Sequence, residues 1–261
     1  MSLPPAEVVR YGEHPDQIAN LHAPAREGGP WPAIVLVHGG YWRERFDRTT
    51  LTPVACDLAA RGYLAWNIEY RRVGQEGGGW PGTFDDVAAA VDRLVDVPAA
   101  DTSAVVAVGH SAGGHLALWL AARRRLPAGA PGAFPRLQPR AVVSLAGVAD
   151  LARGFQAGLG GGACNDLLGG GLDEVPERYA WTSPAALLPL GIQQLVVHGD
   201  KDEPVPIDQS STYVANARAA GDEIEFLEFA GADHFDVIDT QHAAWAAVVE
   251  RLPGLLASAP T

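Results

Sequence analysis

The sequence is poor in basic residues for a chain of 261 residues. Lysine and arginine together number 19 against 31 acidic residues, which gives a formal net charge of −12. Proteins that bind a phosphate backbone gather lysine and arginine to neutralise it. The charge balance therefore argues against nucleic acid as a partner.

Cysteine is scarce, and Cys56 and Cys164 are the only two in the chain. Their number and spacing form neither a disulfide framework nor a set of metal ligands. No two histidines show the spacing of a metal site such as H-E-x-x-H. We therefore expect two free thiols, which fit a reducing compartment, and no metal.

Long apolar runs are also missing. No stretch approaches the roughly 18 apolar residues that are typical of a membrane-spanning helix. Residues 1–7, M-S-L-P-P-A-E, lack the basic and apolar regions of a secretory leader. These absences predict a soluble, cytoplasmic protein that does not bind a membrane.

Short apolar runs, by contrast, alternate with helical patterns along the chain. Most of these runs are too uniformly apolar to have one face in water, which is typical of a parallel sheet covered on both faces. We expect strands at 33–37, 63–68, 104–108, 141–145, 194–197 and 223–229. Helices are expected at 50–61, 83–97, 112–125, 208–220 and 235–252, with Asp208 as an N-cap.

This alternation predicts a doubly wound α/β fold with a mostly parallel sheet and right-handed crossovers. The length fits a single domain over residues 1–261. The stretch 147–190, rich in glycine and proline, interrupts the alternation and is longer than an ordinary connection. Because both of its flanks belong to the same alternation, we interpret it as a small cap-like insertion.

The pattern with the most specific chemistry is Gly109-His110-Ser111-Ala112-Gly113. In such a G-x-S-x-G elbow, a serine lies on a strained turn between a strand and a helix, with its hydroxyl raised above the sheet. The two glycines leave room for a close approach of the backbone. Since an expected strand precedes the motif and an expected helix follows it, we predict that Ser111 is a catalytic nucleophile.

A serine hydroxyl needs a general base, and the base needs an orienting acid. In hydrolases with this elbow, the order along the chain is serine, acid, histidine. H-G-D-K-D offers Asp200 and Asp202 after one expected strand, and A-D-H-F offers His234 after another. We predict that Asp202 is the acid and His234 the base, and that Asp200 bonds the loop backbone.

Structural roles are expected for the other histidines. We expect His110 to pack beneath the elbow and His115, one turn further on, to pack or form a hydrogen bond. His38 is expected to brace its loop through hydrogen bonds. His198, at the end of a strand, is expected to be structural or solvated.

The segment V-H-G-G-Y-W, residues 37–42, follows the expected strand 33–37. Acyl transfer needs N–H donors for the charge that develops on the carbonyl oxygen, one from the residue after the serine and one from the loop after an earlier strand. We predict Gly40, Tyr41 and Ala112 as these donors. Tyr41 and Trp42 would also flank the acyl pocket, and a position in the core is the alternative for Trp42.

Taken together, the motifs resemble the α/β-hydrolase fold over nearly the whole chain, from about residue 11 to 252. H-G-G-x-W is similar to the oxyanion motif of kynurenine formamidases (arylformamidases). Y-G-E-H-P-D-Q-I-A-N-L-H-A-P resembles the opening segment of that group and of related small bacterial esterases. The hormone-sensitive-lipase group usually has a third glycine where this chain has Tyr41, so the resemblance points away from that group.

The resemblance implies hydrolysis of a small-molecule amide or ester through an acyl-serine intermediate, without a metal or organic cofactor. The formamidase group implies a substrate of the N-formylkynurenine type, with Trp42, Trp80 or Trp181 packing against an aromatic leaving group. Anchoring of loops to the core is the alternative role for Trp80 and Trp181. A carboxylesterase for short acyl chains and a non-catalytic binding protein are the alternative functions, and a homodimer is left open.

Overall fold

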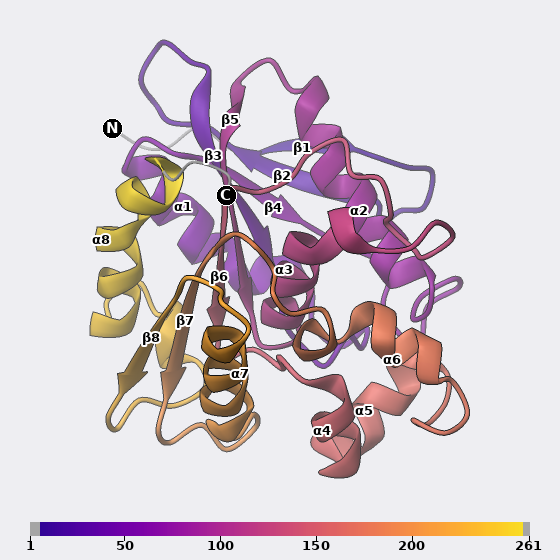
Figure 1. Cartoon of the computed structure of the whole chain (residues 1–261). Helices are drawn as coiled ribbons and strands as arrows, with labels where there is room; N and C mark the ends of the chain where they lie inside the picture. Colours follow the sequence, from indigo (N-terminus) through magenta and orange to yellow (C-terminus); the bar gives the residue numbers. More distant parts are fainter. Residues whose placement is uncertain (1–5, 258–261) are drawn as a thin grey trace.

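The computed structural model describes residues 6–257, so residues 1–5, on which part of the leader prediction rests, lie outside the described range. Within this range, one sheet of eight strands runs in the order β1-β2-β4-β3-β5-β6-β7-β8 (Figure 1). The pairs β1–β2 and β2–β4 are antiparallel, and all other neighbours are parallel. The strands are β1 (Glu7–Arg10), β2 (Ile18–His22), β3 (Trp31–Val37), β4 (Leu64–Ile68), β5 (Ala100–His110), β6 (Ala141–Leu145), β7 (Gln193–Gly199) and β8 (Ile224–Phe229).

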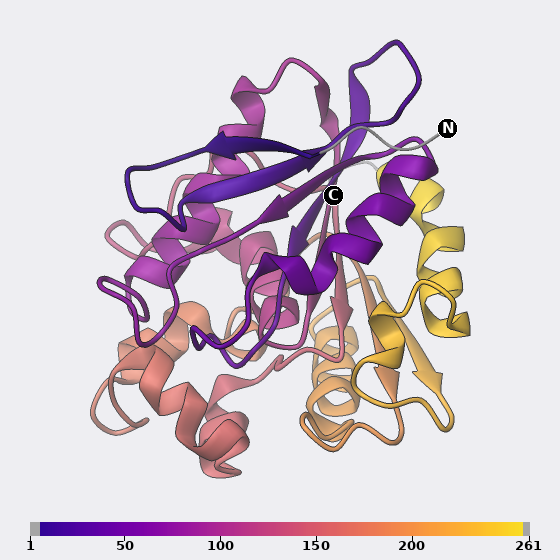
Figure 2. The ribbon, with the colours of Figure 1, turned by 180° about the vertical axis from the view of Figure 1, so that it is seen from behind.

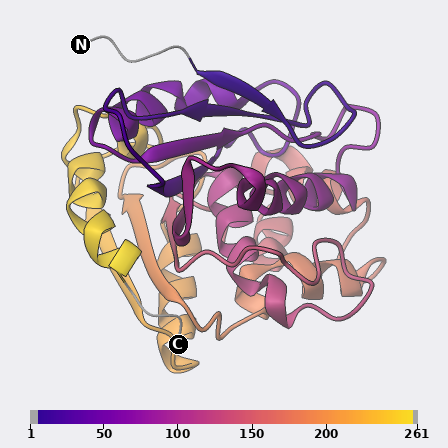
Figure 3. The same cartoon turned by 90° about the horizontal axis from the view of Figure 1, so that it is seen from above.

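Helices cover both faces of this sheet, as Figures 1 and 2 show from opposite sides. One face is covered by α1 and α8, and the other by α2, α3 and α7. Seen from above, the sheet lies between these two layers (Figure 3). The helices are α1 (Thr52–Ala60), α2 (Gly82–Arg93), α3 (Ala112–Ala122), α4 (Leu151–Gln156), α5 (Leu159–Leu168), α6 (Pro176–Thr182), α7 (Asp208–Ala219) and α8 (Ala243–Ala257).

The central strands are mostly apolar because both of their faces are buried. In β3, Val35 and Val37 contact the core beneath α2 and α3, whereas Ile34 and Leu36 belong to the core beneath α1 and α8. Side chains alternate between the two faces of a strand, so a central strand of a three-layer fold needs an apolar residue at each step. The prediction of a mostly parallel sheet covered on both faces is confirmed.

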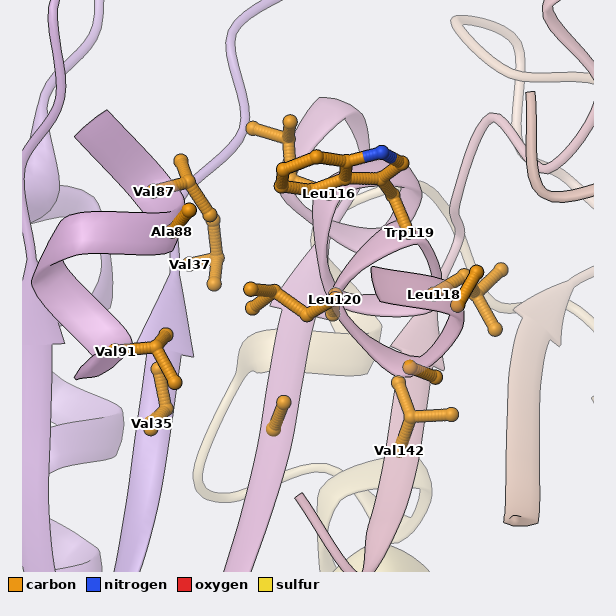
Figure 4. Close-up of a cluster of buried hydrophobic side chains, with 14 of the residues drawn as sticks. Val35, Val37, Val87, Ala88, Val91, Leu116, Leu118, Trp119, Leu120 and Val142 are labelled. Carbon is orange, nitrogen blue, oxygen red and sulfur yellow. The ribbon is translucent and has the colours of Figure 1, made fainter. Parts of the chain in front are cut away.

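Helix α3 is held against the sheet by close apolar packing (Figure 4). Leu116, Trp119 and Leu120 of α3 lie beside Val87 and Val91 of α2, and all five side chains are fully buried. Complete burial of an apolar side chain of this size contributes about 1.5–3 kcal/mol. This packing positions the N-terminal end of α3, which directly follows the elbow serine.

Two strands, β1 and β2, were not among those predicted. They form an antiparallel edge of the sheet, and β1 is only four residues long and mostly exposed. A short strand with one solvated side and one edge has no continuous apolar run to mark it. The strand predicted at 104–108 is the second half of β5, which begins at Ala100.

Two helix ends also differ from the prediction. Asp208 is the first residue of α7 and not its N-cap, and its carboxylate pairs with Arg153. The helix predicted at 235–252 is α8, which begins at Ala243 and continues through Pro253, because Leu255 and Leu256 pack into the core. Within residues 6–257, no helix combines the length and the apolar character that crossing a membrane would need.

The stretch 147–190 folds into α4, α5 and α6, which lie together at the side of the molecule toward which β6, β7 and β8 run (Figure 1). The run Gly160–Gly162 has left-handed backbone angles that favour glycine. Arg43, in the loop after β3, donates to Gly160 O at 2.8 Å and pairs with Asp166 at 2.7 Å. The insertion is therefore attached to the loop that carries the H-G-G-Y-W segment.

Candidate active site

Ser111 lies at the sharp turn between β5 and α3. Its backbone angles, φ 57° and ψ −122°, lie in a region that residues other than glycine rarely adopt. This conformation costs about 1–3 kcal/mol. The Ser111 N–H donates to Leu145 O at 2.8 Å, and the Ser111 carbonyl accepts from the His115 N–H. These two bonds and the packing of α3 hold the serine in its strained conformation.

The glycines of the elbow are required by close contacts between backbone segments. A Cβ atom at Gly109 would lie 2.0 Å from Gly113 O, and one at Gly113 would lie 2.0 Å from Val37 O. Neither backbone oxygen can move away without displacing a strand or a helix. The steric role predicted for these two glycines is confirmed.

Asp202 and His234 are brought together from loops after β7 and β8. His234 Nδ1 lies 2.7 Å from Asp202 Oδ2, and the Val205 N–H donates to Asp202 Oδ1 at 2.7 Å. Burial raises the pKa of Asp202, but hydrogen bonds from His198 and His234 outweigh it and bring the pKa from 3.8 to about 2. The carboxylate is therefore ionised at neutral pH and accepts a hydrogen bond from the Nδ1–H group of His234.

His198 forms a second histidine contact with the same carboxylate. The side chain is fully buried, with Nε2 at 3.0 Å from Asp202 Oδ2 and 2.9 Å from Val205 O, and Nδ1 at 2.7 Å from Ser210 Oγ. Because the two partners of Nε2 only accept, Nε2 carries the proton and Nδ1 accepts from the Ser210 hydroxyl. His198 thus helps to fix the orientation and charge of Asp202.

Asp200 and His115 lie as predicted, whereas His110, which was expected beneath the elbow, lines the cavity beside Ser111. Asp200 Oδ1 accepts the Gly231 N–H at 2.6 Å, so this aspartate bonds the loop backbone. His115 Nε2 donates to Thr182 O, and burial lowers the pKa of this ring to about 4. His110 Nε2 donates to the carbonyl of His234 at 2.8 Å, and burial together with His234 lowers the pKa of His110 to about 3.

The loop after β3 approaches the elbow at its two glycines. A Cβ atom at Gly39 would lie 2.8 Å from both His110 O and Ser111 Cβ, and Gly40 has a φ of 109°. Within residues 6–257, the N–H groups of Gly40, Tyr41 and Ala112 form no hydrogen bond to a backbone acceptor. Of the three residues, Gly40 and Tyr41 line the cavity beside Ser111, and Ala112 follows Ser111 at the start of α3.

A buried charged network lies behind this loop. His38 Nε2 contacts Glu69 Oε1 at 2.8 Å, and its Nδ1 contacts Gly39 O at 2.8 Å. Glu69 also accepts from the backbone N–H of Arg48 at 3.0 Å. Burial raises the pKa of Glu69, but His38, Arg48 and Arg72 together lower it below its usual value. The bracing role predicted for His38 is confirmed, and Glu69 is its partner.

A cavity of about 250 Å³ opens directly beside the serine. Its walls come from the loop after β3, the elbow, the loop at Pro204 and the loop at His234. Ser111, His234, Gly40 and Tyr41 all line it. Its lining residues include none from 147–190, so the insertion contacts the loop after β3 through Arg43 without lining the cavity.

The three tryptophans expected at the substrate lie elsewhere. Trp42 is fully buried, and its indole N–H points to Ala112 O and His115 Nδ1, both at 3.2 Å. Trp80 and Trp181 pack against each other with ring centroids 6.2 Å apart, and neither lines the cavity at Ser111. The substrate-packing role predicted for them is corrected: the Trp42 ring lies in the core, and Trp80 and Trp181 are half-buried and pack against it. Tyr41 does line the cavity, and its hydroxyl donates to Pro204 O.

A family model named BD-FAE matches residues 19–216, which is well over half of the chain. The chain belongs to the BD-FAE family. Ser111 and Asp202 lie within the matched segment, and His234 follows it.

This BD-FAE family member is also similar to curated proteins. It is 27% identical to Esterase LipC of Mycobacterium tuberculosis, over 88% of this chain and 60% of LipC. It is 26% identical to Kynurenine formamidase of Drosophila melanogaster, over 88% of this chain and 75% of the relative. Isoprenylcysteine alpha-carbonyl methylesterase of Arabidopsis thaliana is 24% identical. The chain spans less than two-thirds of LipC and of this methylesterase, 60% and 56% of their lengths.

Two solved structures show how far the fold of this BD-FAE family member is shared. A truncated carbohydrate esterase from gut microbiota superimposes with a TM-score of 0.83 at 20% identity, over 97% of this chain and 96% of that one. Esterase Est2 of Thermogutta terrifontis gives a TM-score of 0.77 at 24% identity, over 97% and 94%. The fold is therefore the α/β-hydrolase fold, and the comparisons support the prediction of a hydrolase.

The sequence interpretation gave His198 a structural or solvated role without its contact with Asp202, and it did not single out Glu69 or some of the residues that line the cavity. His198 precedes Gly199 at the end of β7, and Glu69 follows β4, so each stands at the carboxyl end of a parallel strand, where sites of such sheets are built. That position is the signal that could have singled them out. Arg45, Phe46 and Phe235 line the cavity from loops, and no pattern in the sequence marks them.

Replacement of His198 by phenylalanine tests its contact with Asp202. A hydrogen bond to a charged group contributes about 1.5–3 kcal/mol, so we expect kcat to fall at least about tenfold with little change in KM. Loss of this donor also leaves the Asp202 carboxylate more basic, so that it holds the Nδ1 proton of His234 more tightly, and the acid limb of the pH profile should move to higher pH. Steady-state kinetics across pH measure both effects.

His22→Gln is the matched control, because His22 is a buried histidine at the opposite, antiparallel side of the sheet. It should leave the pH profile unchanged. A His198→Phe protein that folds normally and keeps the wild-type acid limb would contradict the positioning role.

Proposed function

We propose that the chain is a serine hydrolase that cleaves small carboxylic esters through an acyl-serine intermediate. One arrangement carries the proposal: the strained Ser111 shares a cavity with His234, whose other ring nitrogen is bonded to the ionised Asp202. Esterases among the relatives, LipC and the plant methylesterase, support an ester as the substrate. The substrate is a small molecule, in keeping with a cavity of about 250 Å³.

In the proposed mechanism, His234 Nε2 takes the proton of the Ser111 hydroxyl while Oγ attacks the ester carbonyl carbon. The tetrahedral intermediate collapses, the C–O bond to the alcohol breaks, and His234 returns the proton to the departing oxygen. A water molecule then attacks the acyl-serine with the same base, which releases the acid and restores Ser111. Asp202 keeps the Nδ1 proton of His234 in place during both steps.

In the tetrahedral intermediate, the negative charge on the substrate's carbonyl oxygen would lie beside the loop after β3, which contains Gly39 and Gly40. The N–H groups of Gly40, Tyr41 and Ala112, which form no backbone hydrogen bond within the described residues, are the proposed donors. Ala112 also begins α3, so the positive end of the helix dipole faces the same oxygen. Each such donor accounts for about 10²–10³ in rate.

An arylformamidase is the second candidate, and the same groups would then attack a formyl carbon carried by an arylamine. It is favoured by the H-G-G-Y-W segment and by the likeness to Kynurenine formamidase of Drosophila melanogaster. Trp42, Trp80 and Trp181 give it no support, because they do not line the cavity. Tyr41, Phe46 and Phe235 are the aromatic side chains that do.

A panel of matched substrates decides between the two candidates. We expect 4-nitrophenyl acetate and butyrate to be turned over, with kcat/KM falling at least about tenfold for the decanoate, because a long chain exceeds the cavity. Formanilide and N-formylkynurenine should react more slowly than the acetate ester. Initial rates of nitrophenol and formate release measure these differences.

Faster release of formate than of acetate would move the assignment to an arylformamidase. A protein that folds, hydrolyses none of these substrates and does not label with a fluorophosphonate probe would be a binding protein on a hydrolase fold. Ser111→Ala, which cannot be acylated, serves as the blank for both assays.

A cytoplasmic location is part of the same proposal. Cys56 and Cys164 are both free thiols, and free thiols persist where the cell keeps them reduced. Burial raises the pKa of Cys164 to about 12, so this thiol stays protonated and unreactive.

A further inference from the structure

The cavity beside Ser111 has mostly apolar walls with one permanent charge among them. Phe46, Pro204 and Phe235 contribute apolar surface, and no aspartate or glutamate is among the lining residues. Arg45 lines the same cavity. Arg45 is an exposed residue, so its guanidinium is accessible to a charged group on a ligand that occupies the cavity, although solvent partly screens the interaction.

The charge of Arg45 is not neutralised by the protein. Within residues 6–257, no carboxylate forms an ion pair with Arg45, whose guanidinium lies over the ring of Phe46, 5.4 Å from its centroid. The arginines on either side in the same loop are paired: Arg43 with Asp166 at 2.7 Å and Arg48 with Glu69 at 3.4 Å. Arg45 therefore differs from its neighbours both in position and in lacking a counter-charge.

The acidic residues next to Arg45 in the sequence are occupied elsewhere. The Glu44 side chain lies against Gly74, where a Cβ atom would be 3.1 Å from Glu44 Cδ. Asp47 Oδ1 accepts from both the backbone N–H and the hydroxyl of Thr49. Neither carboxylate is directed at the guanidinium, so the cation is open to a ligand.

We propose that Arg45 forms a subsite for a carboxylate carried by the substrate, away from the bond that is cleaved. The planar guanidinium can hold the two carboxylate oxygens through parallel hydrogen bonds. The Phe46 ring and the other apolar walls would take the hydrocarbon between the carboxylate and the ester. This inference rests on the proposed function and names its substrate class: an ester that bears a second, free carboxylate.

The overall charge of the chain makes such a local cation necessary for this class of substrate. With a formal net charge of −12, the general field of the protein repels anions. A carboxylate ester would therefore react more slowly than its neutral analogue unless a nearby cation compensates. Arg45 is the one lining residue with a permanent positive charge, among those that the structure describes.

Two pairs of substrates test the subsite, one for each side of the ester bond. The first is 4-acetoxybenzoate against its methyl ester, and the second is phenyl hydrogen adipate against phenyl methyl adipate. In each pair the measured quantity is the ratio of kcat/KM for the anion to that for the neutral ester. Because Arg45 is exposed, Arg45→Gln should lower this ratio about 2–5-fold in at least one pair, mainly through KM. Arg45→Lys should restore part of it.

Arg26→Gln is the matched control, because Arg26 is an exposed arginine between β2 and β3, outside the cavity lining. It should leave both ratios at the wild-type value. Ratios unchanged by Arg45→Gln in both pairs, or changed equally by Arg26→Gln, would overturn the subsite. Failure of the wild type to hydrolyse any of the four esters would overturn the proposed function, which is a different outcome.

Discussion

Replacement of Ser111 by alanine is expected to lower kcat for 4-nitrophenyl acetate by roughly 10⁶-fold. The hydroxyl is the only part of the residue that reacts, and without it no acyl-serine can form. The remaining N–H donors and His234 can still polarise a carbonyl and a water molecule, so a small residual rate above that of the buffer is expected. Stopped assays with high enzyme concentration measure this residual rate.

The structure predicts that the variant folds normally. Alanine keeps the backbone bonds of Ser111 to Leu145 and His115, which involve no side-chain atom. Circular dichroism and the melting temperature should match those of the wild type. Ser211→Ala, at an exposed position of α7, is the matched control and should keep full activity. A Ser111→Ala protein with substantial turnover would place the nucleophile elsewhere.

Replacement of Asp202 by asparagine is expected to lower kcat about 10⁴-fold. Asp202 Oδ2 accepts from His234 and His198, and Oδ1 accepts the Val205 N–H. An amide group can accept at one end only, so its NH₂ would face one of these donors. If the asparagine NH₂ faced His234, Nδ1 would have to accept a hydrogen bond and the ring proton would move to Nε2. Nε2 could then no longer take the proton of Ser111. Kinetics at saturating substrate isolate this effect on kcat.

Asp200→Asn is the control from the same loop. The amide oxygen of asparagine can still accept the Gly231 N–H, and the other partner of Asp200, Lys201, forms only an exposed ion pair at 3.5 Å. This variant should therefore keep nearly all of the wild-type activity. An inactive Asp200→Asn beside an active Asp202→Asn would reverse the assignment of the acid.

Asp202 also makes the stability of the fold depend on acid pH. Its pKa is about 2 in the folded chain against an ordinary value of 3.8. A carboxyl with a lowered folded pKa stabilises the fold above its unfolded pKa, and this contribution is lost as the pH falls through the folded pKa. The difference in melting temperature between wild type and Asp202→Asn should thus shrink between about pH 4 and pH 2.

Much of the fold could be predicted because short sequence patterns indicate its strands, helices and tight turns. The five apolar residues of 33–37 mark a central strand, since each side of that strand meets a helix layer. The strand and helix around Gly109 and Gly113 identify the elbow for a similar reason. A Cβ atom at either glycine would lie 2.0 Å from a backbone oxygen that cannot move, so only glycine fits there. Strands β1 and β2 escaped because neither has a continuous apolar run: β1 is mostly exposed, and β2 mixes buried with half-buried positions.

The residue roles that failed were those that depend on which way a side chain points. Trp42 stands next to Tyr41, yet one side chain enters the core and the other reaches the cavity. Both residues have positive φ, 58° and 52°. Such backbone angles break the regular alternation of a strand, so the sequence pattern cannot tell which direction each ring takes.

By itself, the sequence determined the type of fold and the chain order of Ser111, Asp202 and His234, because strand periodicity and turn chemistry are local properties of the chain. Only the tertiary structure decided what surrounds them: that His198 shares the carboxylate of Asp202, that Glu69 lies behind the glycine loop, and that Arg45 reaches the cavity. These contacts join residues from separate loops. Their geometry depends on how the strands and helices pack, which no short stretch of sequence contains.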